Sequence, residues 1–256
     1  MIPSALDHVR EIVGDCGRLA VFLDYDGTLT PIVSDPEEAL LSDSMRQTLL
    51  ALAAQAPVAI LSGRDLDDIC QRVDIGTVIY GGSHGFDIAG PRGLHKQVGA
   101  EFLPALDAAE NALRKMLACI PGALVERKRF SVAAHYRNMD ESDVIKTERI
   151  VNQVAAHHRK LRKIGNKKVY EFQPDVDWDK GKAVLWLLEA LGLEQDDVRP
   201  VYIGDDRTDE DAFRALEQRG VGILVGEQPR PTAAKYSLKN TTEVQHFLRA
   251  LISSVS

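Results

Sequence analysis

Short apolar runs alternate with stretches of helical periodicity in the first third and the last third of the chain. Continuous apolar runs are typical of strands covered on both faces of a parallel sheet. An apolar residue at about every third or fourth position is typical of a helix that packs one face on such a sheet. The expected strands are residues 19–24, 57–62, 77–82, 199–205 and 221–226, and the expected helices are 43–55, 65–73, 180–192 and 208–220. This alternation predicts an α/β protein with a doubly wound parallel sheet.

The middle of the chain departs from this alternation. Its pattern is a short hairpin, a helix, two strands, a helix and a further strand, over residues 85–97, 101–120, 123–130, 131–137, 141–161 and 167–173. Two adjacent strand patterns without a helix between them indicate an antiparallel sheet. We therefore expect a discontinuous core, residues 1–86 and 174–256, with an α+β domain inserted over residues 87–173.

Composition and charge limit the classes of function. The chain of 256 residues is 45% hydrophobic and 27% charged, and its net charge of -7 argues against nucleic acid or an anionic membrane as the partner. Cys16, Cys70 and Cys119 are far apart, so we expect core thiols of a reducing compartment. No signal-peptide pattern or membrane-spanning run is visible, which predicts a cytoplasmic protein. The oligomeric state stays open, and a monomer is compatible with the sequence.

Acidic side chains lie at the ends of two of the expected strands. Asp24 and Asp26 lie at the end of the first strand, and Asp205 and Asp206 lie at the end of a neighbouring one. The carboxyl ends of parallel strands line the ligand crevice of such a sheet. Two carboxylates about 4 Å apart repel by ~4 kcal/mol at an effective dielectric constant near 20. A cation among the acids would offset this repulsion, and oxygen ligands without histidine or cysteine favour a hard ion such as Mg²⁺.

Helix capping is the alternative explanation for these acids. Aspartates often follow strands because they cap the next helix or close a turn. Thr208 with Asp211 fits a capping box, and Asp65 with Asp68 fits a cap as well. The role of Thr28 has two explanations as well, because its hydroxyl could hydrogen-bond the aspartates or simply close the turn.

Lysines at the start of an expected helix indicate an anion site. Lys180 and Lys182 flank Gly181, and a cation in the first turn of a helix opposes the helix dipole. A solvated lysine tolerated there is the alternative, whereas a bound anion would make the charge favourable. A metal ion, a lysine and a serine hydroxyl around a carboxylate form a phosphate site in which the carboxylate can act as nucleophile.

This combination predicts the hydrolysis of a phosphomonoester. Asp24 is the expected nucleophile, which forms an aspartyl-phosphate, and Asp26 is the expected general acid and then general base. Asp24, the main-chain carbonyl of Asp26, and Asp205 are expected to bind Mg²⁺. Ser62 and Lys180 are expected to hold the remaining phosphoryl oxygens.

The motifs resemble those of the haloacid dehalogenase superfamily of phosphotransferases. "DYDGT", "LSGR", the lysine of "DKGKA" and "GDDRTDED" occur in the superfamily's order. "GSHGFDIAGP", "VERKRFSVAAHYR" and "EFQPDVDWDKGKA" are further similar to the trehalose-6-phosphate phosphatase family, so that the resemblance covers about residues 19–225. It implies a haloacid dehalogenase-like core with the insert as a cap, and a Mg²⁺-dependent phosphatase that releases trehalose from its 6-phosphate.

The resemblance also implies roles for individual residues. The phosphate-binding residues would be Thr28, Ser62, Arg64 and Lys180; the metal-binding residues Asp24, Asp26, Asp205, Asp206 and Asp209; and the substrate-binding residues His84, Glu126, Lys128, Arg137 and Glu171. The chain departs from the family pattern at Gln173, where members often carry arginine before the proline.

Several alternatives remain open. A phosphatase for another glycosyl phosphate, of the sucrose- or glucosylglycerol-phosphate type, would share these motifs. A phosphoaspartate receiver module also combines clustered aspartates, a lysine and a hydroxyl on a doubly wound sheet, but it needs neither a second acid nor a cap. A phosphomutase would transfer the phosphoryl group to a sugar, and a sugar-phosphate sensor would only bind. Glu126 and Lys128, which alternate on a strand, also fit a solvated strand face.

Overall fold

The chain forms two sheets and divides into two compact units. The computed structural model describes residues 2–14, 17–33, 35–137, 139–166, 168–227 and 230–255, so that Cys16 lies outside the described residues. By their contacts the residues separate into Met1–Lys96 with Trp178–Ser256, and Gln97–Asp177. We call the first the core unit and the second the insert.

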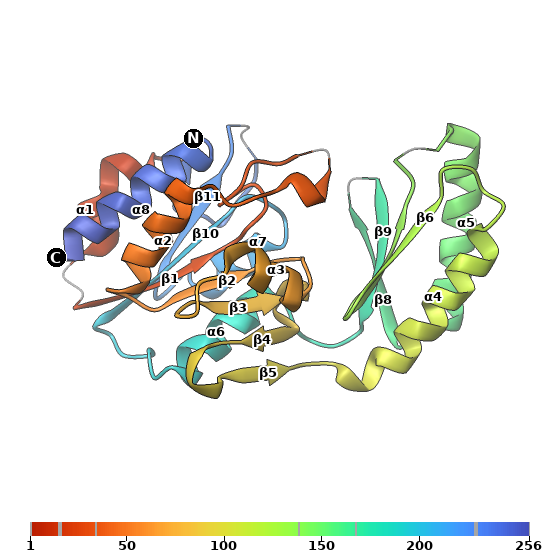
Figure 1. The fold of residues 1–256 in the computed structure, drawn as a ribbon, viewed down its shortest axis with the longest axis horizontal. Helices are drawn as coiled ribbons and strands as arrows, with labels where there is room; N and C mark the ends of the chain where they lie inside the picture. Colours follow the sequence, from red (N-terminus) through yellow and green to blue (C-terminus); the bar gives the residue numbers. More distant parts are fainter. Residues whose placement is uncertain are drawn as a thin grey trace. The chain divides into compact units, whose positions relative to one another are not determined.

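The larger sheet has eight strands among the described residues, in the order β12-β11-β10-β1-β2-β3-β4-β5 (Figure 1). The strands are β1 (Arg18–Leu23), β2 (Val58–Leu61), β3 (Ile79–Gly82), β4 (Asp87–Ala89), β5 (His95–Gln97), β10 (Val198–Gly204), β11 (Val221–Val225) and β12 (Tyr236–Leu238). The pairs from β12 to β3 are parallel, and β4 runs antiparallel to β3. The chain moves outward from β1 on one side and returns to β10 on the other. The crevice where the strand order reverses therefore lies between the carboxyl ends of β1 and β10.

Helices cover both faces of this sheet. They are α1 (Val9–Val13), α2 (Asp43–Ala53), α3 (Leu66–Val73), α6 (Lys180–Ala190), α7 (Asp209–Ala215) and α8 (Thr241–Val255). Val21 and Leu23 of β1 pack in the core that contains residues of α1, α2, α3 and α8. Ala20 and Phe22 pack in the core that contains residues of α6 and α7. Burial on both faces explains why the strand is continuously apolar, and it confirms the predicted doubly wound α/β fold.

The insert is a four-stranded antiparallel sheet with two helices on one face (Figure 1). Its strands are β6 (Leu124–Lys128), β7 (Ser131–His135), β8 (Leu161–Asn166) and β9 (Val169–Pro174), and its helices are α4 (Leu103–Leu117) and α5 (Glu141–His157). Side chains of alternate strand residues, among them Val125, Val132 and Phe172, pack with both helices in a separate hydrophobic core. Short 3-10 turns occur in the chain at Ala5–His8, Pro36–Glu38, Ser83–Gly85, Pro91–Gly93 and Ala100–Phe102.

The observed elements differ from the expected ones in several places. The helix expected over 141–161 ends at His157, and residues from Leu161 form β8, because this charged segment pairs along its length with β9. α7 ends at Ala215, where a longer helix was expected. β4 and β5, which the sequence analysis placed mainly in the insert, extend the larger sheet beyond β3. α1, β12 and α8 lie where the sequence pattern gave no element. No helix in the described part of the chain has the length and apolarity that crossing a bilayer requires.

Candidate active site

Three aspartates meet at the carboxyl edge of β1 and β10. Asp24 follows β1 directly, and its amide donates to the carbonyl of Ile203, so that the strand pairing sets its position. Asp24, Asp205 and Asp209 each place one carboxylate oxygen within 4.8 Å of the others. Asp24 and Asp209 are buried, and Asp205 is half-buried. The sheet thus brings the expected nucleophile and two of the expected metal ligands together.

Lys180 lies among these acids. Its Nζ donates to Asp24 Oδ1 and to Asp209 Oδ1, each at 2.7 Å, and its side chain is only 1% exposed. The hydroxyl of Tyr202 donates to the same oxygen of Asp209 at 2.7 Å. Lys180 is the first residue of α6, where its charge opposes the helix dipole. Two carboxylates at hydrogen-bond distance explain why the cation is stable there.

The electrostatics of the cluster are uneven. Burial raises the pKa of Asp24 well above its ordinary value, Lys180 opposes this, and the other acids add to it. Burial, followed by the charges of Asp209 and Asp206, raises the pKa of Asp205 to about 7. Desolvation acts in the same direction on Asp206, although this residue is exposed, but the charge of Lys180 and hydrogen bonds from Thr208 hold its pKa at about 2. One lysine therefore does not neutralise the acids around it.

Two glycines let these acids approach the backbone. Gly27 has φ of +87°, and a Cβ there would lie 2.3 Å from Asp205 Oδ2. A Cβ on Gly204 would lie 2.3 Å from Cγ of Asp209. Both distances are far shorter than carbon contacts allow, so the carboxylates pack directly on glycine backbone. A side chain at either position would displace an acid of the cluster.

The donor set suits a hard divalent cation. Carboxylate oxygens from three residues converge, and they carry more negative charge than Lys180 offsets. Thr28 lies in the turn that carries Asp26 and is fully buried; among the described residues its hydroxyl has no hydrogen-bond partner. An orphaned buried hydroxyl is costly, which favours a bound phosphate or ion-bound water beside it.

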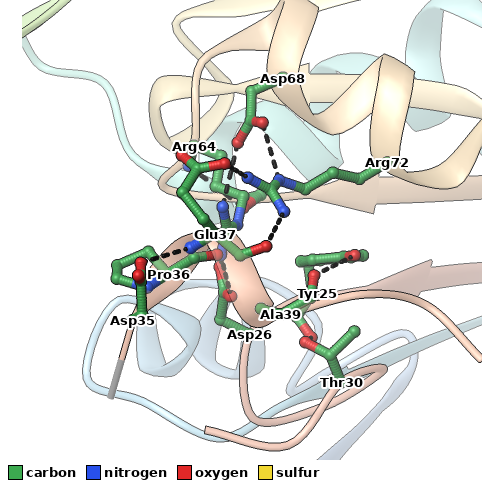
Figure 2. A network of polar contacts seen from close by, with 11 residues as sticks. Tyr25, Asp26, Thr30, Asp35, Pro36, Glu37, Ala39, Arg64, Asp68 and Arg72 are labelled. Carbon is green, nitrogen blue, oxygen red and sulfur yellow. Dashed lines mark hydrogen bonds and ion pairs between the residues drawn. The ribbon is translucent and has the colours of Figure 1, made fainter. Parts of the chain in front are cut away.

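Asp26 has a different environment (Figure 2). Its two carboxylate oxygens accept hydrogen bonds from Arg64 Nε at 2.8 Å and from Arg64 Nη2 at 2.7 Å. Arg64 also donates to Asp68 and to the carbonyl of Pro36, so four of its five N–H donors are in use. At most one N–H of Arg64 is therefore left for a phosphate, the role that the sequence analysis expected for it.

Helix capping accounts for Asp206 and for one oxygen of Asp209, because the Asp206 amide donates to Asp209 Oδ2 at 2.9 Å; it does not account for Asp24 or Asp205. Asp206 Oδ1 accepts from the amide and the hydroxyl of Thr208, both at 2.7 Å, and from the amide of Asp209 at 3.3 Å. The expected capping box fails, because Thr208 makes no side-chain cap on α7 and Asp65 makes none on α3. Asp206 and Asp209 thus each use one oxygen in the turn before α7, and the other oxygen of Asp209 binds Lys180.

Ser62 and His84 lie together in the core unit. Ser62 is fully buried; its Oγ accepts from the amide of Arg64 at 3.1 Å, and its carbonyl accepts from the amide of His84. His84 has φ of 60°, and its ring packs on Gly63, where a Cβ would lie 2.8 Å from Cε1. Its charge also lowers the pKa of Asp206. The expected phosphate-binding serine and the histidine are therefore neighbours at the same strand ends.

The remaining expected substrate residues lie in the insert. Glu126 and Glu171 both pair with Ala133 in the strand register, so they share the sheet face opposite the helices. Lys128 is on the same face, and Arg137 is exposed in the turn after β7. Glu126 also accepts from His135, whose Nε2 is 2.7 Å from Glu126 Oε2. We call this face, with Glu126, Lys128, His135, Glu171, Gln173 and Arg162, the polar sheet face.

Arg162 is the member of this face that sequence reasoning missed. It pairs with Gln173 in the register, donates to Gln173 Oε1 at 3.5 Å, and donates to the carbonyl of Val176 at 3.3 Å. The helix expected over 141–161 stops before Arg162, and the sequence pattern gave residues 162–166 no element. The pairing of β8 with β9 in the folded chain places Arg162 beside Gln173.

Comparisons with known proteins identify the family of the chain. The family model for trehalose-phosphatase matches residues 22–242. Trehalose-phosphate phosphatase B of Arabidopsis thaliana is 41% identical over 265 residues, which cover 98% of this chain and 71% of that protein. In sequence this chain is 24% identical to the C-terminal domain of Candida albicans trehalose-6-phosphate phosphatase, with a TM-score of 0.83 and 100% of both chains covered. A haloacid dehalogenase-like hydrolase from Bacteroides thetaiotaomicron is 16% identical, with a TM-score of 0.66 over 91% of this chain and 98% of that one.

These findings differ in what they establish. At such low identity the two solved structures show the fold alone, and they confirm the haloacid dehalogenase-like architecture. The family model and the plant relative extend through both units and take in every acid of the cluster. Asp24, the buried nucleophile candidate, is held by Lys180 at the edge of the sheet. On the family model and the plant relative, the chain belongs to the trehalose-phosphatase family and is a phosphatase.

Proposed function

We propose that this phosphatase hydrolyses trehalose 6-phosphate to trehalose and phosphate, with Mg²⁺ as cofactor and an aspartyl-phosphate on Asp24 as intermediate. The observation that carries the proposal is the contact of Lys180 with Asp24 and Asp209 beside Asp205. It keeps a carboxylate available at a strand end and leaves excess negative charge for a divalent cation.

The reaction divides between Asp24 and Asp26. A carboxylate oxygen of Asp24 bonds to phosphorus, the bond from phosphorus to the sugar oxygen breaks, and Asp26 gives that oxygen a proton. Asp26 then takes a proton from the water that attacks phosphorus, and the bond from phosphorus to Asp24 breaks. Ser62, Thr28 and Lys180 hold phosphoryl oxygens, with the single free N–H of Arg64 as a further donor.

Asp24, the main-chain carbonyl of Asp26, and Asp205 would hold the Mg²⁺, with Asp206 and Asp209 as the other acids of the set. When bound, the ion offsets the repulsion between the acids and the phosphate and polarises the phosphoryl group. Asp209 also accepts a hydrogen bond from Lys180 Nζ and so helps to hold the lysine beside Asp24.

We further propose that the insert, Gln97–Asp177, is a cap and that its polar sheet face binds the sugar. Glu126, Lys128 and Glu171 present both charge signs and hydrogen-bonding capacity for sugar hydroxyls, and Arg137 adds donors. His84, in the core unit, stays a separate predicted substrate-binding residue. Glu171 is buried although it is charged, a position that a solvated strand face would not require. The residues outside this range form the catalytic core.

The wider expectations remain predictions. The substrate is a sugar phosphate, and neither nucleic acid nor a membrane is expected as a partner. Cys70 is half-buried and Cys119 is exposed, so the core position expected of the cysteines is wrong for Cys119. A reducing compartment and a cytoplasmic location stay predictions. The oligomeric state also stays open, with a monomer compatible.

Phosphate release from a panel of sugar phosphates tests the substrate. The panel contains trehalose 6-phosphate, sucrose 6-phosphate, glucosylglycerol phosphate and glucose 6-phosphate, each with and without a chelator. We expect kcat/KM to be highest for trehalose 6-phosphate and activity to disappear on chelation and return with Mg²⁺. A higher kcat/KM for another glycosyl phosphate would reassign the substrate. A stable phosphoprotein without turnover would favour a receiver module.

The sugar contacts need a separate test. Replacement of Glu171 by alanine should lower kcat/KM for the sugar phosphate far more than for an aryl phosphate, because the aryl compound has no sugar hydroxyls. Glu148→Ala, which removes an exposed glutamate of α5, is the matched control. Equal losses on both substrates would reject the sugar contact of Glu171.

A further inference from the structure

A chain of alternating charges extends from Asp26 across the surface of α3 (Figure 2). Arg64 joins Asp26 to Asp68, with Nη1 at 3.0 Å from Asp68 Oδ2. The other oxygen of Asp68 accepts from Arg72 Nε at 2.7 Å. Arg72 in turn donates to the carboxylate of Glu37 at 2.8 Å and to its carbonyl at 3.2 Å. The network is therefore continuous from the proposed proton donor to the turn Pro36–Glu38.

Helix geometry explains the order of these residues. Arg64, Asp68 and Arg72 follow one another at intervals of four residues, so they lie on one side of α3 and the turn before it. The two arginine side chains are 10% and 7% exposed, whereas the carboxylate of Asp26 is 42% exposed. The guanidinium groups are thus the enclosed members of the network. Their planar forks leave little freedom for the acids that they bind.

The position of Arg64 determines the position of Asp26. Both oxygens of Asp26 are bound by the same guanidinium, so a movement of Arg64 moves the carboxylate as well. The carbonyl of Pro36 and the ring of Tyr25, 5.5 Å from the guanidinium carbon, hold Arg64 on its other sides. Asp68 accepts from Nη1, on the remaining edge of the Arg64 guanidinium. Arg72 in turn holds Asp68 in place through the other carboxylate oxygen.

We propose that Asp68 and Arg72 are positioning residues for the proton transfer by Asp26, and that they act through Arg64. The proposal rests on the proposed function, because it assigns Asp26 the proton that the leaving oxygen takes. Neither residue would contact the phosphate. Their effect is on the orientation of one carboxylate, and its loss should appear only where the leaving group needs a proton.

Two substrates separate this effect from a general loss of structure. The oxygen of a sugar alcohol is a poor leaving group and needs a proton, whereas the nitrophenolate of p-nitrophenyl phosphate leaves without one. kcat/KM reports the steps up to the first irreversible one, the release of the leaving group, so later hydrolysis of the intermediate does not enter. The ratio of kcat/KM for the sugar phosphate to kcat/KM for p-nitrophenyl phosphate therefore measures leaving-group protonation.

Asp68→Asn and Arg72→Gln are the test variants. We expect the ratio to fall by roughly tenfold in each, a part of the 100-fold or larger contribution typical of a positioned acid. Arg72→Lys should restore part of the loss, because it keeps the charge beside Asp68. Arg18→Gln is the matched control, since Arg18 also binds an aspartate with two nitrogens, at the opposite end of β1. Equal losses on both substrates, or an unchanged ratio, would overturn the proposal.

A double-mutant cycle makes the test specific to Asp26. In an Asp26→Asn background the ratio is already low, so adding Arg72→Gln should change it by less than twofold. A further tenfold fall there would show that Arg72 acts elsewhere and would overturn the proposal. Thermal unfolding of each variant shows whether it is folded. Failure of the wild-type enzyme to release phosphate from any sugar phosphate would instead reject the proposed function.

Discussion

Replacement of Asp205 by asparagine should change how the stability of the metal-free protein depends on pH. Burial and neighbouring acids raise the pKa of Asp205 to about 7 in the folded protein, from an ordinary value of 3.8. Between these two values the folded protein holds a proton that the unfolded chain has released. The free energy of unfolding therefore falls as the pH rises through this interval, and the contribution of Asp205 is lost by about pH 7.

The slope follows from linkage. One proton of difference changes the free energy of unfolding by about 1.4 kcal/mol per pH unit. Asp205 is only partly buried, and water screens its interactions, so we expect roughly 1 to 3 kcal/mol between pH 5 and pH 7. Asparagine is neutral at every pH. The variant should therefore gain stability relative to the wild-type protein by this amount over the same interval.

Urea unfolding in the presence of a chelator measures this difference at each pH. Asp197→Asn is a suitable control, because Arg18 holds the pKa of exposed Asp197 below its ordinary value and both states are ionised above pH 5. Excess Mg²⁺ should reverse the trend, since the ion binds the ionised acids of the folded state. A difference between the Asp205 variant and the wild-type protein that is constant from pH 5 to pH 8 would refute the reasoning.

Three further predictions concern the same cluster. Asp24→Asn should leave the fold intact and abolish phosphate release and phosphoenzyme formation; more than a tenth of the wild-type activity would contradict its role as nucleophile. Lys180→Met should abolish activity and lower the free energy of unfolding at pH 8 by about 3 to 5 kcal/mol, because it leaves Asp24 and Asp209 buried without their cation. Urea unfolding measures this loss, and a clearly smaller loss would contradict the prediction. Gly27→Ala should reduce kcat by at least tenfold, because its Cβ meets Asp205 and φ is positive; wild-type kcat would show that the turn adapts.

Sequence reasoning succeeded where a periodic pattern was long. The parallel strands of the core, and with them the meeting of Asp24 and Asp205, follow from the strand–helix alternation and the rule that carboxyl ends share an edge. It failed at β8, where a charged segment adopts a strand because β9 supplies its hydrogen bonds. Propensity within one segment is a weak guide when a neighbouring strand competes for it.

The sequence also did not predict that Arg64 binds the carboxylate of Asp26. "DYDGT" and "LSGR" placed Asp26 and Arg64 near strand ends, but nothing in either motif says that the guanidinium binds the carboxylate. That pairing requires the start of α3, the turn Pro36–Glu38 and the ring of Tyr25 to enclose Arg64 together. These three elements come from separate parts of the chain.

By itself the sequence determined the fold class, the family and the set of acids and lysine proposed to carry the chemistry, because these depend on residue type, order and local periodicity. Only the tertiary structure decided which groups touch: Lys180 between Asp24 and Asp209, Asp206 in the turn before α7, and Asp26 on Arg64. Contacts of that kind depend on side-chain direction and on distances across elements far apart in the chain. Such distances are properties of packing, which a linear pattern does not contain.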